Sequence, residues 1–317
     1  MFDFWNSLDV KIQAALISGL ISFTSIFLTI KGKIWYEKLS LNYRLDQEFK
    51  FEQRKKLKED LSKNKMHHIN AVESLSHRIW NFVQNIDRKK HSISEGEWGD
   101  KNQYYINSFI YRFLEFLYWT LKVEKDAVNI DTTNADPQDI KFLKYIKTFK
   151  DIFTDIDLFK SLNYNPDHNK NHFFKNDLVT YSKWIINDRG EVMDFDEFKK
   201  VLLSSYDKMK VLIEYFTNIK NSITDPSLNA LRCFHFLAID YLNKYGHDYQ
   251  KTDQEKLDRI VNLHRNKIAI KSEFLEFIKK SKLDNEIDIL IDSKLPKIGA
   301  ISKGTMLFKA FPIKIHT

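Results

Sequence analysis

The chain has 317 residues, of which 43% are hydrophobic and 29% charged, and its formal net charge is +7. This composition excludes wholesale disorder, and the scarcity of Gly (8) and Pro (5) favours long helices over a turn-rich β fold. The single cysteine, Cys233, excludes an intrachain disulfide framework and a cysteine-based zinc site. We therefore expect an all-α protein in which Cys233 is a small buried residue of the core.

Residues 12–30 form an apolar run without a charged residue and predict a transmembrane helix. At about 1.5 Å per residue, this helix would cross a hydrocarbon core of roughly 30 Å. Aromatic residues that suit the two membrane interfaces flank the run: Phe4, Trp5, Trp35 and Tyr36. A cleaved signal peptide is the alternative, but the N-terminal flank is poor in basic residues and no small-residue cleavage site follows. We interpret the run as an uncleaved anchor.

Basic residues gather on the C-terminal side of this predicted span. Four of them follow it closely: Lys31, Lys33, Lys38 and Arg44. Only Lys11 precedes the span, so the positive-inside rule places residues 1–11 outside the cytoplasm and residues from 31 onward inside it. We expect the four basic side chains to contact anionic lipid headgroups.

Small residues recur along the predicted span at spacings of three and four. They are Ala15, Ser18, Ser22, Ser25 and Thr29. This spacing places them on one helix face, and small residues let helices approach closely in lipid. We therefore predict a homo-oligomer that associates through this face. In the alternative interpretation, the hydroxyl groups bond their own backbone and mark no interface.

Residues 31–91 predict a basic helical stalk beside the membrane. This segment has 15 Lys and Arg against eight Asp and Glu, whereas residues 92–292 have 29 against 33. Because the basic excess lies beside the predicted span, membrane lipid explains it more simply than nucleic acid. An apolar seam follows at spacings of four and three: His68, Val72, Leu75, Ile79, Phe82 and Ile86. Such a helix packs on its own domain or pairs with another copy.

Residues 92–292 predict a cytoplasmic helical-bundle domain. A buried helix is expected over 104–123, with Arg112 and Glu115 as an ion pair at the edge of the core or as a polar site lined by Tyr111 and Tyr118. Further helices are expected at 171–186, 196–220, 227–245, 253–270 and 272–282. Helix boundaries are signalled by Asp136–Pro137, Asp194, Asp225–Pro226 and Gly246.

The last 25 residues, 293–317, contain five Lys and no acidic residue. They predict a basic C-terminal tail, which is mobile, forms two short strands or touches the membrane surface.

The motifs of common nucleotide enzymes and hydrolases are absent from the sequence, and we expect no cofactor. Arg259, Asn262 and His264 resemble the R-x4-6-H motif of HEPN ribonucleases. That resemblance implies a metal-independent ribonuclease in which the Arg and His act on the scissile phosphate. Ile260 departs from the family pattern, which has a polar residue after the Arg. The alternative is an exposed charged face of a helix.

A metal site is a weaker possibility at His168 and His172, which are four residues apart and adjoin Asp167. The sequence fixes no third ligand, and a loop with a helix cap explains the same residues. We therefore predict no metal centre.

Four segments resemble a group of bacterial single-pass membrane-anchored helical proteins with no assigned activity. They read FEQRKKLKEDLSKNK, LSHRIWNF, YRFLEFLYW and DHNKNHFFKNDL. The resemblance implies a bacterial inner membrane location and an association with antiviral defence against phage. The expected function is a membrane effector or sensor that self-associates and responds to an unknown cytoplasmic protein partner. A membrane-tethered HEPN-like ribonuclease and a non-catalytic scaffold are the alternatives.

Overall fold

The computed structural model describes residues 9–89, 91, 103–127, 135–162, 164–165, 171–264 and 268–283. Within these ranges every regular element is helical, apart from an isolated antiparallel bridge between Ile186 and Val192. The prediction of an all-α protein is confirmed. The chain divides into two compact units. The first unit is Met1–Glu59 with Ile130–Asp136, and the second unit is Asp60–Asn129 with Pro137–Thr317.

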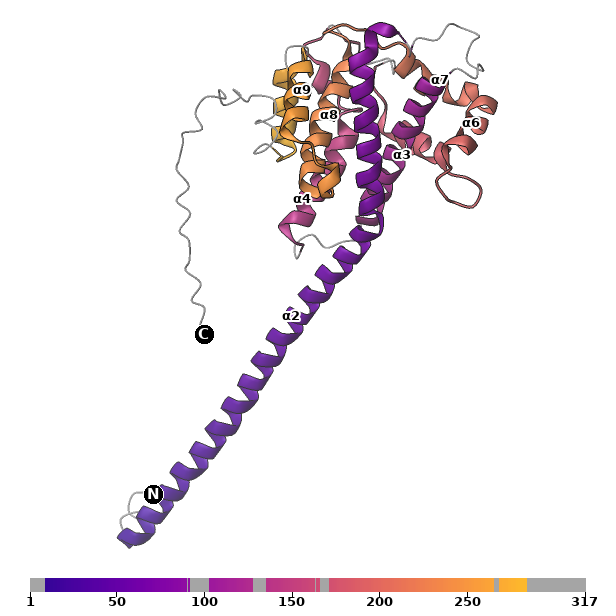
Figure 1. The fold of residues 1–317 in the computed structure, drawn as a ribbon. Helices are drawn as coiled ribbons and strands as arrows, with labels where there is room; N and C mark the ends of the chain where they lie inside the picture. Colours follow the sequence, from indigo (N-terminus) through magenta and orange to yellow (C-terminus); the bar gives the residue numbers. More distant parts are fainter. Residues whose placement is uncertain are drawn as a thin grey trace, which may run out of the picture. The chain divides into compact units, whose positions relative to one another are not determined.

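The first helix, α2 (Val10–Asn85), runs without interruption for 76 residues (Figure 1). It contains no Pro, which would remove a backbone hydrogen bond, and only two Gly, so nothing in its sequence forces a break. No side chain between residues 9 and 56 is buried, whereas buried side chains begin at Leu57. The boundary between the units follows Glu59 and therefore lies inside α2. The second unit thus includes the later half of the segment that the sequence analysis groups as a stalk.

The apolar seam of α2 is buried in the second unit. All members of the seam are at most 5% exposed: His68, Val72, Leu75, Ile79 and Phe82 on α2, and Ile86, which directly follows α2. Of the two expected roles, packing on the same chain is the one that the structure shows.

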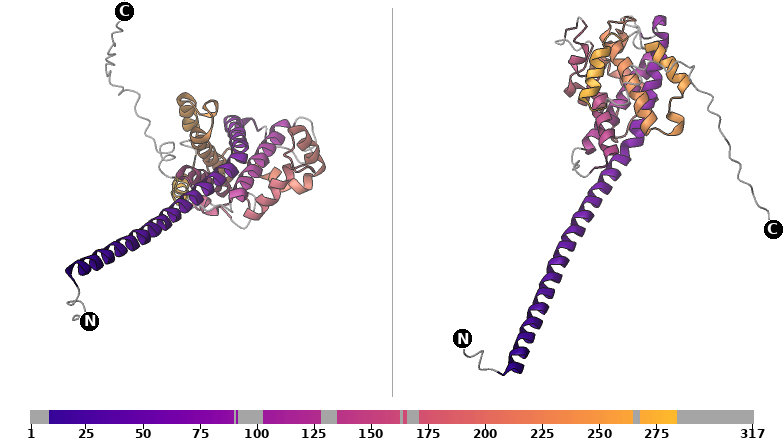
Figure 2. Two further views of the ribbon diagram at one scale, coloured as in Figure 1. Left: turned by 90° about the horizontal axis from the view of Figure 1, so that it is seen from below. Right: turned by 90° about the vertical axis from the view of Figure 1, so that its left-hand side faces the viewer.

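Shorter helices make up the rest of the second unit. In chain order they are η1 (Ile86–Arg88), α3 (Tyr104–Ala127), α4 (Pro137–Asp151), η3 (Ile156–Phe159), α5 (Lys175–Tyr181), η4 (Ser182–Ile185), α6 (Phe195–Ser204), α7 (Tyr206–Thr217), α8 (Pro226–Tyr245), η5 (Asp248–Gln250), α9 (Gln254–His264) and α10 (Lys271–Lys280). Helix α4 packs against α3 and α8, and α5, α6 and α7 pack against α3 (Figures 1 and 2).

Aromatic rings fill the space between α3, α4 and α8. The ring of Phe116 lies 5.8 Å from that of Phe149 and 4.9 Å from that of Phe234, in edge-to-face arrangements. Phe149 also meets Tyr241 edge to face at 5.3 Å. These geometries are the favoured ones for ring pairs, and the rings exclude water from the centre of the unit. Cys233 is fully buried in the same region, as predicted.

The predicted helix starts are confirmed where an Asp precedes the helix. The side chain of Asp225 accepts a hydrogen bond from the backbone N–H of Leu228 at 2.8 Å, and Pro226 opens α8. Asp194 forms a reciprocal capping box with Glu197 at the start of α6. Each carboxylate satisfies backbone N–H groups that have no partner within the helix.

Three expected helices are wrong in part. The helix expected at 196–220 is split into α6 and α7 at Ser205, whose φ of −124° and ψ of 30° are not helical. The helix expected at 171–186 begins only at Lys175, because the N–H of Phe173 donates to the carbonyl of Phe153 at 2.8 Å. The helix expected at 253–270 ends at His264.

Gly246 ends α8, as predicted, but not through a left-handed backbone, since its φ is −74°. A glycine is needed there for a different reason. A Cβ at this position would lie 2.6 Å from the carbonyl oxygen of Leu242, which is too close for any other residue.

Candidate membrane-spanning helix and buried polar groups

Within the described residues, one helix is long and apolar enough to cross a membrane, and its apolar stretch lies near the start of α2. Large side chains of that stretch, such as Leu20, Phe23 and Leu28, are about 70% exposed. No part of this stretch is buried inside the protein. An apolar surface of this size needs lipid or another chain to cover it, so this stretch is the candidate membrane helix.

The hydroxyl groups on the predicted small-residue face bond the helix itself. Ser18 Oγ donates to the carbonyl of Ala15 at 3.0 Å, and Thr29 Oγ1 donates to the carbonyl of Ser25 at 2.7 Å. Thr24, on another face, bonds Leu20 in the same way at 2.9 Å. Such bonds satisfy a hydroxyl within an apolar surrounding. Ser18 and Thr29 therefore need no polar partner from another helix, and the role of the small-residue face, which also includes Ser22, in association stays a prediction.

The four basic residues that follow the span are exposed: Lys31, Lys33, Lys38 and Arg44. Lys31 Nζ lies 4.9 Å from the ring centre of Phe27, so this side chain turns back toward the span. Lys33 forms only a long, exposed ion pair with Glu37 at 3.9 Å. Pairs of this kind are weak, so the ammonium groups can exchange them for lipid phosphates.

The three residues that resemble the ribonuclease motif do not share one surface. All belong to α9. Arg259 and Asn262 are exposed, and Arg259 forms an ion pair with Glu255 at 3.7 Å. His264 is fully buried, and its Nε2 lies 2.8 Å from Nδ1 of His235. An RNA phosphate that met Arg259 could not meet His264 in this arrangement.

The contact between His235 and His264 joins α8 to α9, and the sequence analysis missed it. In this hydrogen bond one imidazole nitrogen donates and the other accepts, so one of the two facing nitrogens carries a proton and the other does not. Burial, together with the positive charges of Lys256 and His77, lowers the pKa of His235 to about 3. His235 is therefore neutral where it contacts His264 in the core. The two histidines are 29 residues apart, and the residues next to each of them in the sequence do not indicate the pair.

The metal candidates are not assembled in the described part of the chain. His172 is buried, its Nδ1 bonds the hydroxyl group of Tyr164, and its ring lies 5.1 Å from that of Phe174. Burial lowers the pKa of His172. His168 and Asp167 lie outside the described residues. Among the residues that are described, no group of three His, Cys, Asp or Glu could hold a metal ion.

The polar residues of α3 include Arg112, Glu115, Tyr111 and Tyr118. Arg112 and Glu115 are half-buried, and burial raises the pKa of Glu115 while Arg112 opposes that rise. The hydroxyl group of Tyr111 donates to the carbonyl of Met193 at 3.0 Å, whereas the ring of Tyr118 lies against that of Trp119. The described contacts of Tyr111 and Tyr118 thus lead to different partners.

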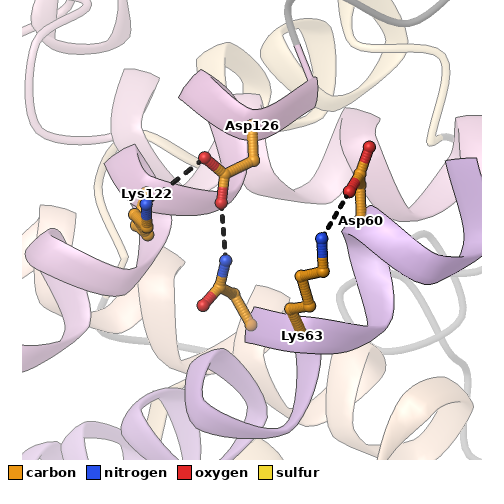
Figure 3. Close-up of polar contacts among 5 residues, drawn as sticks. Asp60, Lys63, Lys122 and Asp126 are labelled. Carbon is orange, nitrogen blue, oxygen red and sulfur yellow. Dashed lines mark hydrogen bonds and ion pairs between the residues drawn. The ribbon is translucent and has the colours of Figure 1, made fainter. Parts of the chain in front are cut away.

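Polar contacts link α2 to the end of α3 within the second unit (Figure 3). Asn64 Nδ2 donates to Asp126 Oδ2 at 2.6 Å, and Lys122 Nζ reaches Asp126 Oδ1 at 3.4 Å. Lys63 pairs with Asp60 at 2.8 Å along α2 itself. Of the three contacts, the one between Asn64 and Asp126 joins the two helices, close to the point where α2 enters the second unit.

An open hollow of about 280 Å³ lies between α4 and the end of α10. Its lining mixes basic and acidic groups: Lys144, Lys147, Asp151, Asp155, Lys280 and Lys282. Asp151 is within 3.7 Å of Lys175, and Lys280 is within 3.6 Å of Glu276. Such partly compensated charges are typical of a solvated surface and do not converge on one point.

No known protein family, curated protein or solved structure matches this chain. The resemblance to bacterial membrane-anchored proteins therefore stays a prediction. Within the described residues, the exposed apolar stretch of α2 is the largest feature that requires lipid or another chain to cover it.

Proposed function

We propose that this chain is a single-pass membrane protein that anchors its helical second unit at a membrane and acts there by self-association. The observation that carries this proposal is the exposed, charge-free run of residues 12–30 near the start of α2. A soluble helix of this kind would leave a long apolar surface in water, which is strongly unfavourable. Insertion in a bilayer removes that surface from water, and the helix itself satisfies the hydrogen bonds of its backbone there.

The charges that flank the span support one orientation. The basic residues after Ile30 outnumber those before it, so the second unit lies in the cytoplasm, beneath the inner membrane of a bacterial cell. In this location it is positioned to bind a cytoplasmic protein partner. The chain would then act as a membrane effector or sensor, and no reaction of its own is required.

The buried position of His264 argues against a ribonuclease at α9. A catalytic acid or base must reach the proton that it transfers, and His264 contacts His235 instead of solvent. Without an accessible His264, the motif presents only the charged group of Arg259 on an exposed face of α9.

Charges placed in the middle of the span test the proposal. The chain with Ile21→Arg and Phe23→Arg should leave the membrane fraction, because each Arg at the centre of a span costs about 2.5–3.5 kcal/mol of insertion free energy. The matched control is Phe49→Arg with Phe51→Arg, which replaces two exposed apolar residues of α2 at the same spacing but outside the predicted span. The measurement is the share of protein that stays in membranes after an alkaline wash, with growth and membrane potential followed in the same cells.

Three results decide between the functions. Action at the membrane is supported if the control stays in the membrane fraction, the double variant is released, and the double variant no longer changes growth as the original chain does. Retention of both variants contradicts the predicted span. Release of the double variant with an undiminished effect on growth contradicts a membrane effector, and a variant with Arg259→Ala would then test the ribonuclease.

A further inference from the structure

The small-residue face of α2 continues beyond the predicted span at the same spacing. After Thr29 the steps of three and four lead to Gly32, Tyr36, Leu39 and Tyr43. Within the span this face carries small side chains, and beyond Gly32 it carries large side chains, each more than half exposed. We call the whole row, from Ala15 to Tyr43, the small-residue face.

A second apolar row lies on the opposite side of α2. Its members are Leu16, Leu20, Phe23, Phe27, Ile34, Leu41 and Leu45, and all are between 50% and 70% exposed. At 3.6 residues per turn, the centres of the two rows are about 180° apart around the helix. We call this row the bulky face.

Lipid can cover only part of these two rows. Tyr43 and Leu45 come 13 and 15 residues after Ile30, so they lie about 20 Å beyond the end of the span. The headgroup layer adds only about 5–8 Å on each side of the hydrocarbon core. The apolar residues near Tyr43 therefore need protein to cover them, on both sides of the helix.

We infer that copies of this chain associate side by side, with the small-residue face of one α2 against the bulky face of the next. This inference rests on the proposed function, because anchoring in one orientation makes neighbouring α2 helices parallel and brings equal residue numbers to equal heights. From Ala15 to Gly32 a small side chain then faces a large one, for example Ser22 opposite Phe23 and Gly32 opposite Ile34, whereas beyond Gly32 two rows of large apolar side chains face each other, as at Leu39 and Leu41. Large residues packed into gaps left by small ones fill space well in helix pairs.

A two-fold arrangement leaves one of the two apolar rows uncovered. A two-fold dimer through the small-residue face would leave Leu41 and Leu45 in water, and a dimer through the bulky face would leave Leu39 and Tyr43 there. A face-to-opposite-face contact covers both rows in every interior copy. Contacts of this kind produce a closed ring when the rotation from one copy to the next adds up to a full turn, and an open row when it does not. The assembly thus contains more than two copies.

Cysteine cross-linking of the full chain in native membranes tests the arrangement. Leu39→Cys marks the small-residue face, Leu41→Cys marks the bulky face, and Asn42→Cys, which lies between the two faces, is the control. Cys233 is buried with a raised pKa and does not take part. We expect a ladder of dimers, trimers and larger species from the chain with both Leu39→Cys and Leu41→Cys. Each single variant should remain mostly monomeric, and a mixture of the two single variants should give dimers.

Strong dimer formation by Leu39→Cys alone would overturn the arrangement in favour of a two-fold dimer. Absence of any ladder from a chain that stays in the membrane fraction would overturn self-association along α2 and leave the anchor intact. Loss of the chain from the membrane fraction would instead remove the proposed function itself. Cross-linking as strong from Asn42→Cys as from the double variant would show unspecific collisions and would also count against the inference.

Discussion

His68 and His235 are buried imidazole groups whose charge follows from their surroundings. Nδ1 of His68 lies 2.8 Å from the hydroxyl group of Tyr241, and its Nε2 lies 3.2 Å from Oγ1 of Thr120. Burial lowers the pKa of His68 to about 3, and the pKa of His235 is equally low. Both rings are therefore neutral in the folded protein at any pH where the protein is expected to work.

These two pKa values predict that acid destabilises the fold. The unfolded chain binds a proton at each His below a pKa of 6.5, whereas the folded chain does not until about pH 3, so the stability contribution is present above pH 6.5 and is lost as pH falls. At pH 5 each His should have lowered the free energy of unfolding by about 2 kcal/mol. Urea unfolding in detergent at pH 7 and pH 5 measures the loss.

Exchange of both residues separates this effect from general acid denaturation. A chain with His68→Gln and His235→Gln should lose less stability between pH 7 and pH 5 than the original chain, whatever its stability at pH 7. The exposed neighbour His67 provides the control, and His67→Gln should keep the full loss. An unchanged loss in the double variant would show that other groups cause the acid sensitivity.

The residue scale also shows what spacing can and cannot predict. The spacing of His68 placed it correctly on the apolar seam of α2. Its hydrogen-bond partner Tyr241 is 173 residues away, and nothing local to either residue indicates the pair. The burial of His264 was missed for the same reason, since the motif reading uses only the residues of α9 and His235 belongs to α8.

At the scale of the element, α2 is one helix with two different environments. Phe82 is fully buried, and its ring meets that of Phe109 edge to face at 5.3 Å. Phe49 is 54% exposed on the same helix. The same substitution should therefore have very different effects at the two positions.

Phe82→Ala should lower the free energy of unfolding by about 3–5 kcal/mol, because it removes buried apolar surface and leaves a cavity. Phe49→Ala should change it by less than about 0.5 kcal/mol in detergent that keeps the chain monomeric. Urea unfolding followed by near-ultraviolet circular dichroism measures both. Equal losses in the two variants would contradict the placement of the unit boundary near Glu59.

Helix boundaries were predictable where a side chain acts on its own backbone. Asp225 and Asp194 cap their helices through contacts of two or three residues, so the sequence contains the whole signal. The break at Ser205 has no such signal, since apolar residues continue on both sides of it. The late start of α5 depends on the bond from Phe173 to Phe153, which only the fold brings together.

At the scale of the whole molecule, the uneven distribution of charge predicts the orientation in the membrane. Replacement of Lys31, Lys33, Lys38 and Arg44 by Gln removes the basic cluster next to the span. The variant should insert in mixed orientations, because Lys11 then competes on the other side. Protease accessibility of a C-terminal tag, measured in intact spheroplasts, reports the share of inverted chains.

The matched control removes the same number of charges far from the span. Lys199, Lys200, Lys208 and Lys210 on α6 and α7 serve this purpose, since all four lie in the second unit. Their replacement by Gln should leave the tag protected. A protected tag in both variants would show that the cluster does not set the orientation.

The exposed part of α2 between residues 31 and 59 has a practical consequence for purification. This part has nine large exposed side chains: Ile34, Trp35, Tyr36, Leu39, Leu41, Tyr43, Leu45, Phe49 and Phe51. A fragment that begins at residue 31 would keep all of them and should aggregate in aqueous buffer. A fragment that begins at Asp60 would lose them and keep the buried seam, so it is the better starting material for crystallisation without detergent.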